Sequence, residues 1–159
     1  MPTQGTSGSI HRKLSRFARV SPGRRALLAE AAVWLVLSRL ALALVPFPVL
    51  GRRLGAFVGP VQARALQSPA TAAQAAIALE IGWAVKRAAR HVPFKAVCLP
   101  QAMAARLMLS RRGVKSILHF GAAKGVRTPI AAHAWLDVAG VEVTGYPVDG
   151  RFTEIACFV

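Results

Sequence analysis

The residues best suited to covalent chemistry in this sequence are a cysteine and a histidine, Cys98 and His133. Cys98 opens the stretch CLPQAMAARLMLSRRG (98–113), in which Pro100 is tolerated only in the first turn of a helix and Gly113 suits its C-terminal end. Cys98 is therefore predicted at a helix N-terminus, where unpaired N–H groups and the helix dipole favour the thiolate, the nucleophilic form. A buried cysteine that only fills space is the commoner alternative.

A base for such a thiol has to come from one of four histidines. His11 lies in a polar segment and His91 at a helix end among basic residues, and neither has an evident task. His119, in SILHF, is typical of an ordinary strand residue. His133, in AAHAWLD, has small neighbours and shares its strand face with Trp135, which would shield the ring from water. Together, this histidine and the helix-start cysteine predict nucleophilic catalysis better than either residue does alone.

The cysteine count, the net charge and the pattern of basic residues narrow the other classes of function that this sequence could have. Cys157 is expected in a terminal strand and should be dispensable for chemistry. Two cysteines make no disulfide framework, and no Cys/His cluster has zinc spacing, so neither a metal nor a directly bound cofactor is predicted. The net charge of +15 favours acidic peptides, polyanions or an anionic membrane as partners. The basic residues lack aromatic interleaving, so nucleic acid is not predicted.

The elements that would position the cysteine and the histidine fall into three segments. Residues 1–22 are polar and basic and are predicted to form a flexible tail. Residues 23–93 are predicted to form a helical segment packed on the core, and residues 94–159 the catalytic core itself. One structural domain is expected over 23–159. Its N-terminal helices precede a small antiparallel sheet, which is an α+β arrangement.

Local signals give the element boundaries within these segments. A first helix is predicted from Ser21-Pro22-Gly23 to about Val45, and an Ala-rich second helix begins at Ser68-Pro69. Beyond Gly113 the hydrophobic period changes to about two, which predicts strands in a meander with a turn at Ala139-Gly140. The strand segments are VKSILHFGAA (114–123), IAAHAWLDV (130–138), VEVTGY (141–146) and FTEIACFV (152–159).

The apolar run ALLAEAAVWLVLSRLALALVPFPVL (26–50) could be mistaken for a membrane span. Glu30 and Arg39 interrupt it, and a charge near the centre of a bilayer costs roughly 2.5 to 3.5 kcal/mol. A buried or partner-facing helix is therefore favoured, while peripheral membrane contact and a true span remain alternatives. No segment has the pattern of a secretory signal, so the predicted location is the cytoplasm, with membrane association left open.

The quoted stretches carry a family resemblance. CLPQAMAARLMLSRRGVKSILHFGAAKG (98–125), followed by AHAWLDVAGVEVTGY (132–146), resembles the transglutaminase-like cysteine peptidases of lasso-peptide biosynthesis. These B-type maturation proteins remove the leader from a ribosomally made precursor. The likeness extends over roughly residues 24–159. It implies a papain/transglutaminase-like cysteine peptidase core, with Cys98 as the nucleophile and His133 as the general base and acid.

The third catalytic group is where this sequence departs from that family. In relatives an acid usually follows the histidine by about a dozen residues, and Gly145 stands near that place. Asp149, just past the strand, is the first candidate. Asp137 is the second, because four strand residues place it about 13 Å from His133, and Glu142 across the turn is likewise distant. A dyad whose imidazole is oriented by a backbone carbonyl is the third alternative.

The resemblance also implies a reaction and its partners. The Cys98 thiolate would form a thioester with the precursor, and the N–H of Cys98 would face the oxyanion. Gln101 is a second candidate donor, although it is expected to face solvent. The expected partners are the precursor peptide, a separately encoded leader-binding protein and an ATP-dependent asparagine-synthetase-like cyclase, through which any ATP requirement would arise. Transglutaminase-like acyl transfer and a non-catalytic basic protein on membrane or nucleic acid are the alternatives.

Overall fold

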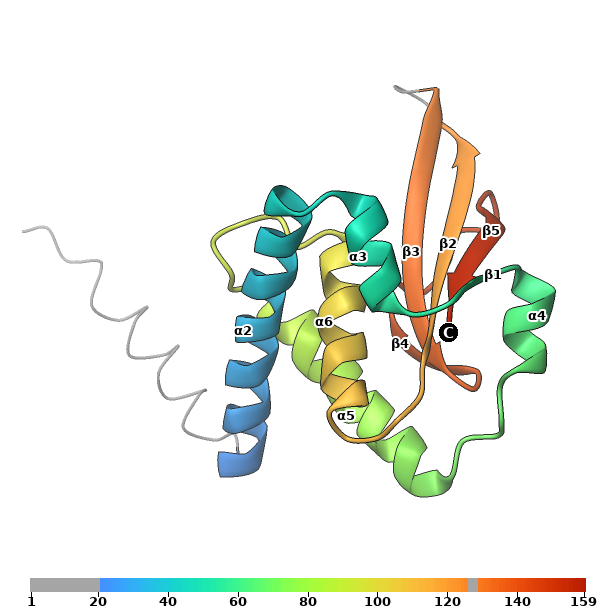
Figure 1. Cartoon of the computed structure of the whole chain (residues 1–159). Coiled ribbons are helices and arrows are strands. Elements are labelled where there is room, and N and C mark those ends of the chain that lie inside the picture. Colours follow the sequence, from blue (N-terminus) through green and yellow to red (C-terminus); the bar gives the residue numbers. More distant parts are fainter. Residues whose placement is uncertain (1–20, 126–128) are drawn as a thin grey trace, which may run out of the picture.

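The computed structural model describes residues 21–125 and 129–159, so most of the predicted tail lies outside the described residues. Most of the helices come first in the chain, and most of the sheet comes last (Figure 1). The helices are α2 (Pro22–Leu44), α3 (Phe47–Leu54), α4 (Pro60–Ala65), α5 (Ala72–Ala88) and α6 (Cys98–Ser110). The strands are β1 (Phe57–Val58), β2 (Ile117–Lys124), β3 (Ile130–Val138), β4 (Val141–Thr144) and β5 (Thr153–Phe158).

The first long helix begins and ends where local chemistry requires. The Ser21 side chain accepts a hydrogen bond from the Arg24 backbone N–H at 3.4 Å, and Pro22 occupies the first helical position. Helix α2 ends at Leu44 because Val45 has an extended backbone. The predicted first helix is thereby confirmed.

Of the next two long helices, α5 begins later than the sequence predicts and α6 begins where it predicts. Helix α5 begins at Ala72 rather than at the Ser-Pro pair, because Thr71 and Gln74 form a reciprocal capping box. Helix α6 begins at Cys98 as predicted. Just beyond its end, Gly113 has a φ of 67°, a left-handed conformation that favours glycine.

The five strands form one antiparallel sheet in the order β1-β5-β2-β3-β4. The predicted turn between β3 and β4 is present, with positive φ values of 48° at Ala139 and 85° at Gly140. Strand β5 returns beside β2 instead of beside β4, so the sheet is not the simple meander that the sequence predicts. This placement brings the Phe158 ring to 5.6 Å from Phe120 in the core. The α+β class is confirmed.

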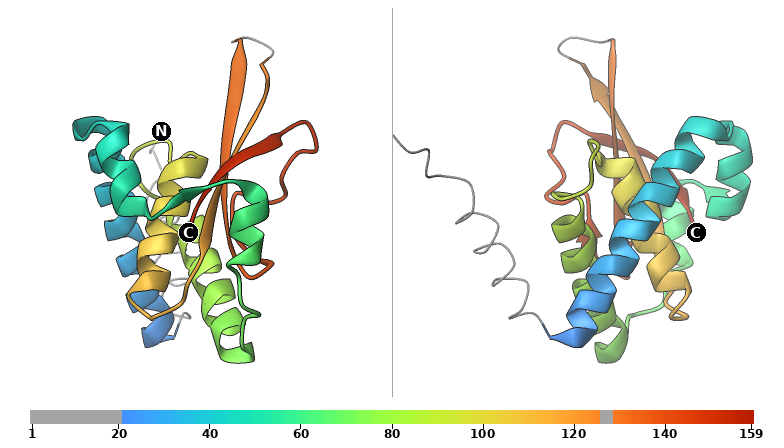
Figure 2. Two further views of the ribbon diagram at one scale, coloured as in Figure 1. Left: turned by 45° about the vertical axis from the view of Figure 1, so that its right-hand side comes forward. Right: turned by 90° about the vertical axis from the view of Figure 1, so that its left-hand side faces the viewer.

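The sheet separates two unequal layers. Helices α5 and α6 cover one face, with α2 packed on their outer side, and the short α4 lies against the other face (Figures 1 and 2). Because strand side chains alternate, Ala134 and Leu136 of β3 face the large helical core, whereas His133, Trp135 and Asp137 face the side of α4. The candidate catalytic side chains of β3 therefore lie on the face of the sheet that only the short helix α4 covers among the described helices.

Helix α2 needs a separate description because of its composition. Among the described residues it is the one helix long and apolar enough to cross a membrane. It nevertheless packs on α5 and α6, with Leu28, Ala31 and Leu35 buried in the core of the domain.

Candidate active site

The structure places Cys98 at the first position of α6, half-buried against the core. The preceding residue, Val97, has an extended backbone and offers no side-chain cap. The N–H groups of Cys98 and Leu99 have no hydrogen-bond partner among the described residues, and Pro100 has no N–H to offer. Two donors at the positive end of the helix are thus available beside the Cys98 sulfur.

Gln101 closes the turn that leads into this helix. Its side-chain amide donates a hydrogen bond to the carbonyl oxygen of Ala96 at 2.6 Å. The amide is therefore committed to holding the backbone before Cys98, and the remaining amide hydrogen is the part of Gln101 that could reach an oxyanion.

His133 lies in β3, and one of its ring nitrogens is fixed. Nε2 lies 2.7 Å from the carbonyl oxygen of Gly145. A carbonyl only accepts hydrogen bonds, so Nε2 carries the proton, and Nδ1 of the neutral ring is left as the basic nitrogen. The ring is walled by Trp135 at 5.8 Å and by Phe152 at 5.2 Å between centroids. This tautomer is the one that a general base acting through Nδ1 needs.

The two acids considered for orienting His133 make other contacts. Asp149 accepts a hydrogen bond from its neighbour Arg151 and forms an exposed ion pair with the same residue at 3.0 Å. Asp137 contacts His119 instead. Among the described residues neither carboxylate is bonded to His133, whose orienting partner is the carbonyl of Gly145.

The backbone at Gly145 explains how a carbonyl comes to stand at the place where the resemblance implies an acid. Gly145 has a φ of 83°, and a Cβ atom there would lie 2.5 Å from the oxygen of Ala134 and 2.7 Å from Cα of Trp135. The chain can approach β3 this closely only without a side chain. The carbonyl is thereby brought to the imidazole that an acidic side chain would otherwise orient.

Cys98 and His133 lie on neighbouring elements, since α6 packs against β3. In Figures 1 and 2 the yellow N-terminal end of α6 stands about level with the middle of β3. The two side chains are not hydrogen-bonded to each other within the described residues, and they lie on opposite faces of the sheet, Cys98 in the helical core that Ala134 faces and His133 on the side that carries Trp135. The structure therefore does not bring the candidate nucleophile and the candidate base together.

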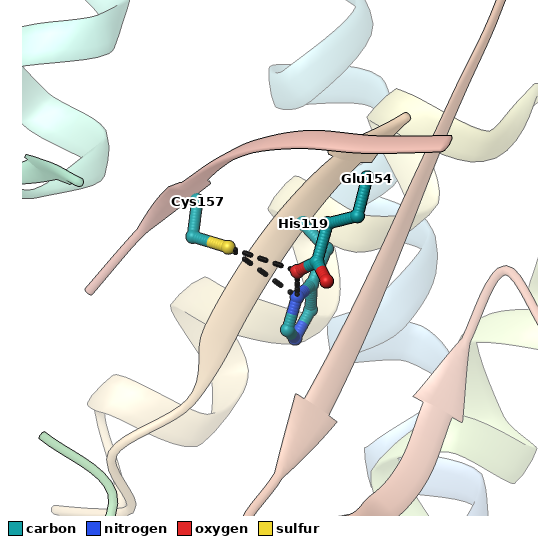
Figure 3. A group of neighbouring side chains, drawn as sticks. All are labelled: His119, Glu154 and Cys157. Carbon is teal, nitrogen blue, oxygen red and sulfur yellow. Dashed lines mark hydrogen bonds and ion pairs between the residues drawn. The ribbon is translucent and has the colours of Figure 1, made fainter. Parts of the chain in front are cut away.

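A second cluster of reactive groups was missed by the sequence analysis (Figure 3). His119 Nε2 lies 2.6 Å from an Asp137 oxygen, and His119 Nδ1 lies 2.6 Å from a Glu154 oxygen. The Cys157 sulfur lies 3.5 Å from the same Nδ1 and 3.1 Å from Glu154. Cys157, His119 and Asp137 thus have the order of contacts of a Cys–His–Asp triad.

Electrostatics argue against Cys157 as a nucleophile. Burial, together with the adjacent Glu154 carboxylate, raises the pKa of the Cys157 thiol to about 12. Its side chain is fully buried, so no substrate reaches the sulfur. The thiol instead donates a hydrogen bond to Glu154. At neutral pH this cysteine is a structural thiol rather than a thiolate.

The other members of the cluster form a buried ion triad. Burial opposes the charged forms, but hydrogen bonds and charges from Asp137 and Glu154 outweigh it and raise the pKa of His119. The same contacts overcome burial to lower the pKa of Asp137 and of Glu154. The pKa shifts therefore favour a protonated His119 ring between the carboxylates of Asp137 and Glu154. Arg64 adds an ion pair to Glu154 at 2.6 Å.

This cluster also contains the residues that could hold a metal. One ligand atom each from His119, Glu154 and Cys157 lies within 4.8 Å of the others, and Asp137 on the far nitrogen of His119 would orient the imidazole. In the structure the same atoms are all satisfied by one another's hydrogen bonds. The arrangement is therefore complete as a hydrogen-bonded network.

Trp135 links the two histidines. Its ring stacks on His119 with an interplanar angle of 1° and a centroid distance of 5.4 Å, and it stacks on His133 at 22°. Gly121 leaves room for it, since a Cβ there would lie 2.8 Å from the indole. The ion triad therefore supports the indole that packs beside the candidate base.

A well-formed cavity has neither histidine among its lining residues. It has a volume of about 720 Å³ and lies between the α4–α5 connection and the end of α6. Gln67, Arg106 and Val138 are among its lining residues, and neither Cys98 nor His133 is. A peptide bound at Cys98 would use a different surface.

Comparison with known proteins assigns the family. Residues 41–157 match the model of the transglutaminase-like superfamily, so the chain belongs to that superfamily, which includes cysteine peptidases and acyl transferases. The match contains Cys98, His133 and all of the sheet except Phe158, the last residue of β5. A search of curated proteins and a search of solved structures found no significant match.

Proposed function

We propose that this protein is a cysteine peptidase that removes the leader from a ribosomally made lasso-peptide precursor. The observation that carries the proposal is the position of Cys98 at an uncapped helix start with two unpaired N–H groups, in a chain of the transglutaminase-like superfamily. Nucleophile and oxyanion donors occur together there. The lasso-peptide substrate rests on the resemblance of residues 98–125 and 132–146 to that family of maturation proteins.

The proposed chemistry has two halves. The Cys98 sulfur attacks the carbonyl carbon of the scissile bond, and the oxyanion accepts hydrogen bonds from the N–H groups of Cys98 and Leu99. His133 takes the thiol proton on Nδ1 and gives it to the leaving amine. Water then hydrolyses the thioester, with the same nitrogen as its base. Gly145 keeps the proton on Nε2 throughout.

Reaching Cys98 requires a movement of the His133 ring. The hydrogen bond to Gly145 holds the ring beside Trp135, and β3 pairs with β4 only from Leu136 onward. At the level of His133, this edge of β3 is covered by Gly145 rather than by a paired strand. A displacement of Gly145 from this edge, with the His133 ring moving with it around the edge toward Cys98, is the step that we propose for precursor binding.

The proposed partners follow from the same resemblance. A separate leader-binding protein would deliver the precursor, and an ATP-dependent asparagine-synthetase-like cyclase would close the ring of the released core. A cationic enzyme attracts an acidic leader at long range, so association should slow with added salt.

The experiment is incubation of the full chain with a candidate precursor, with and without a leader-binding partner, followed by mass spectrometry. Cleavage at one bond with the gain of one water supports hydrolysis. A product carrying an added amine identifies acyl transfer, the second function open to the same thioester. Intact precursor with wild-type chain and partner present would contradict the proposal.

A further inference from the structure

Helix α2 is apolar on two opposite faces. One face is buried in the domain and consists of Leu28, Ala31, Leu35 and Ser38. The other face is exposed, and α3, which follows α2 in the chain, adds two more exposed apolar residues. We call it the outer stripe, and it consists of Val33, Val36, Leu37, Leu40, Leu44, Phe47 and Val49.

Helical geometry shows that the α2 part of the outer stripe is one continuous surface. At about 100° per residue, the five stripe residues of α2 fall within an arc of roughly 100° around the helix axis. They are Val33, Val36, Leu37, Leu40 and Leu44. The buried face points the opposite way. Leu44 is 78% exposed and Val33 56% exposed, so these are not edge residues of the core. Seven of the fifteen large exposed hydrophobic residues of the described chain lie in this stripe.

The charges on the same two helices are almost all positive. Arg39, Arg52 and Arg53 are exposed and have no acidic partner in the part of the chain that the structure describes. The one acid of α2 and α3, Glu30, is already paired with Arg112 at 2.6 Å. Arg39 projects toward the buried face of α2, so the guanidinium groups that accompany the exposed apolar residues are those of Arg52 and Arg53 on α3.

The inner face of α2 fixes how the helix can meet a partner. Glu30 holds it to Arg112 beyond the end of α6, and Arg24 holds it to Glu80 of α5 at 2.6 Å. A membrane-spanning orientation would remove Leu28 and Leu35 from the core. The helix can keep these contacts only by lying flat, with the outer stripe turned away from the domain.

We propose that the outer stripe docks on the surface of an anionic lipid bilayer, with α2 and α3 in the plane of the interface. Aliphatic side chains next to unpaired cations fit the boundary between acyl chains and anionic head groups. A second copy fits less well, because two chains of net charge +15 repel each other. This inference does not depend on the proposed peptidase activity.

The test is sedimentation of the full chain with vesicles of phosphatidylcholine alone or with phosphatidylglycerol added. We expect binding to the mixed vesicles that weakens with salt. The double variant Leu40→Gln/Leu44→Gln should lower the partition coefficient at least about tenfold, and Arg52→Glu/Arg53→Glu should do so for the mixed vesicles.

Matched controls distinguish binding through the outer stripe from nonspecific adsorption to the vesicles. Leu79→Gln and Arg87→Glu change exposed residues of α5, and they should leave partitioning within about twofold of wild type. Equal binding by the stripe variants and wild type, with native circular dichroism, would overturn the proposal. So would a lipid-free dimer, seen by analytical ultracentrifugation, that Leu40→Gln/Leu44→Gln dissociates, because a second copy would then be the occupant.

Discussion

The carbonyl oxygen of Gly145 accepts a hydrogen bond from Nε2 of His133 at 2.7 Å, twelve residues along the chain. The superfamily resemblance places an acid at about this distance from the histidine. Here the backbone makes the contact, because no side chain fits at Gly145. A neutral carbonyl fixes the tautomer but adds no negative charge, so it stabilises an imidazolium less than a carboxylate does.

Replacing Gly145 with alanine should destabilise the protein and disturb His133. The Cβ atom would meet the Ala134 oxygen at a backbone angle that disfavours any side chain, and we expect a loss of about 2 kcal/mol or more. Thermal denaturation measures the change. Gly150→Ala is the matched control, because nothing lies within 4 Å of its added Cβ, and it should unfold within about 0.5 kcal/mol of wild type. Equal stability of the two variants would contradict the close approach.

The ion triad should give the folding stability a defined pH window. The pKa of His119 is raised above its ordinary 6.5, so its stabilisation is complete below pH 6.5 and is lost as the pH rises through the folded value. The pKa values of Asp137 and Glu154 are lowered from 3.8 and 4.5, so their stabilisation is present above those values and is lost on further acidification. The contribution of the triad is therefore largest between pH 4.5 and 6.5.

His119→Gln tests this window by thermal denaturation across pH. Leaving two buried carboxylates without their cation should cost about 3 kcal/mol at pH 6 and less at alkaline pH, where wild-type His119 itself loses its proton. The exposed His91→Gln is the control and should follow wild type at every pH. A cost for His119→Gln that is constant from pH 5 to pH 10 would show that His119 is not charged in the fold.

The two cysteines should differ in reactivity. Cys98 is half-buried at a helix start, and Cys157 is fully buried with a raised pKa. Iodoacetamide at pH 7.5 should therefore modify Cys98 in the native protein, and Cys157 only after denaturation. Peptide mapping by mass spectrometry assigns the site. Modification of Cys157 first would move the candidate nucleophile to the His119 cluster.

Features set by neighbouring residues were predictable from the sequence. Pro22 after Ser21 marked the start of α2, and Pro100 and Gly113 bracketed α6. The positions of Cys98 and His133 on a helix start and a strand follow from the same local rules. The turn at Ala139-Gly140 is another local signal that the structure confirms.

Features that depend on distant segments were not predictable. The cluster of His119, Asp137, Glu154 and Cys157 draws on three strands, and it exists because β5 pairs with β2 rather than with β4. Once that register is known, strand alternation puts His119, Asp137 and Cys157 on one face, and the bulge in β5 opposite Phe120 and Gly121 brings Glu154 onto the same face. The role of the Gly145 carbonyl likewise depends on a close backbone approach that no sequence pattern marks.

The most direct test of the central claim compares single cysteine and histidine variants in precursor cleavage. Cys98→Ala and His133→Ala should each lower cleavage by at least about a thousandfold with native far-UV circular dichroism, whereas Cys157→Ala and His119→Gln should retain turnover wherever they remain folded. Cleavage that survives Cys98→Ala but is abolished by Cys157→Ala would contradict the account and assign the reaction to the buried cluster.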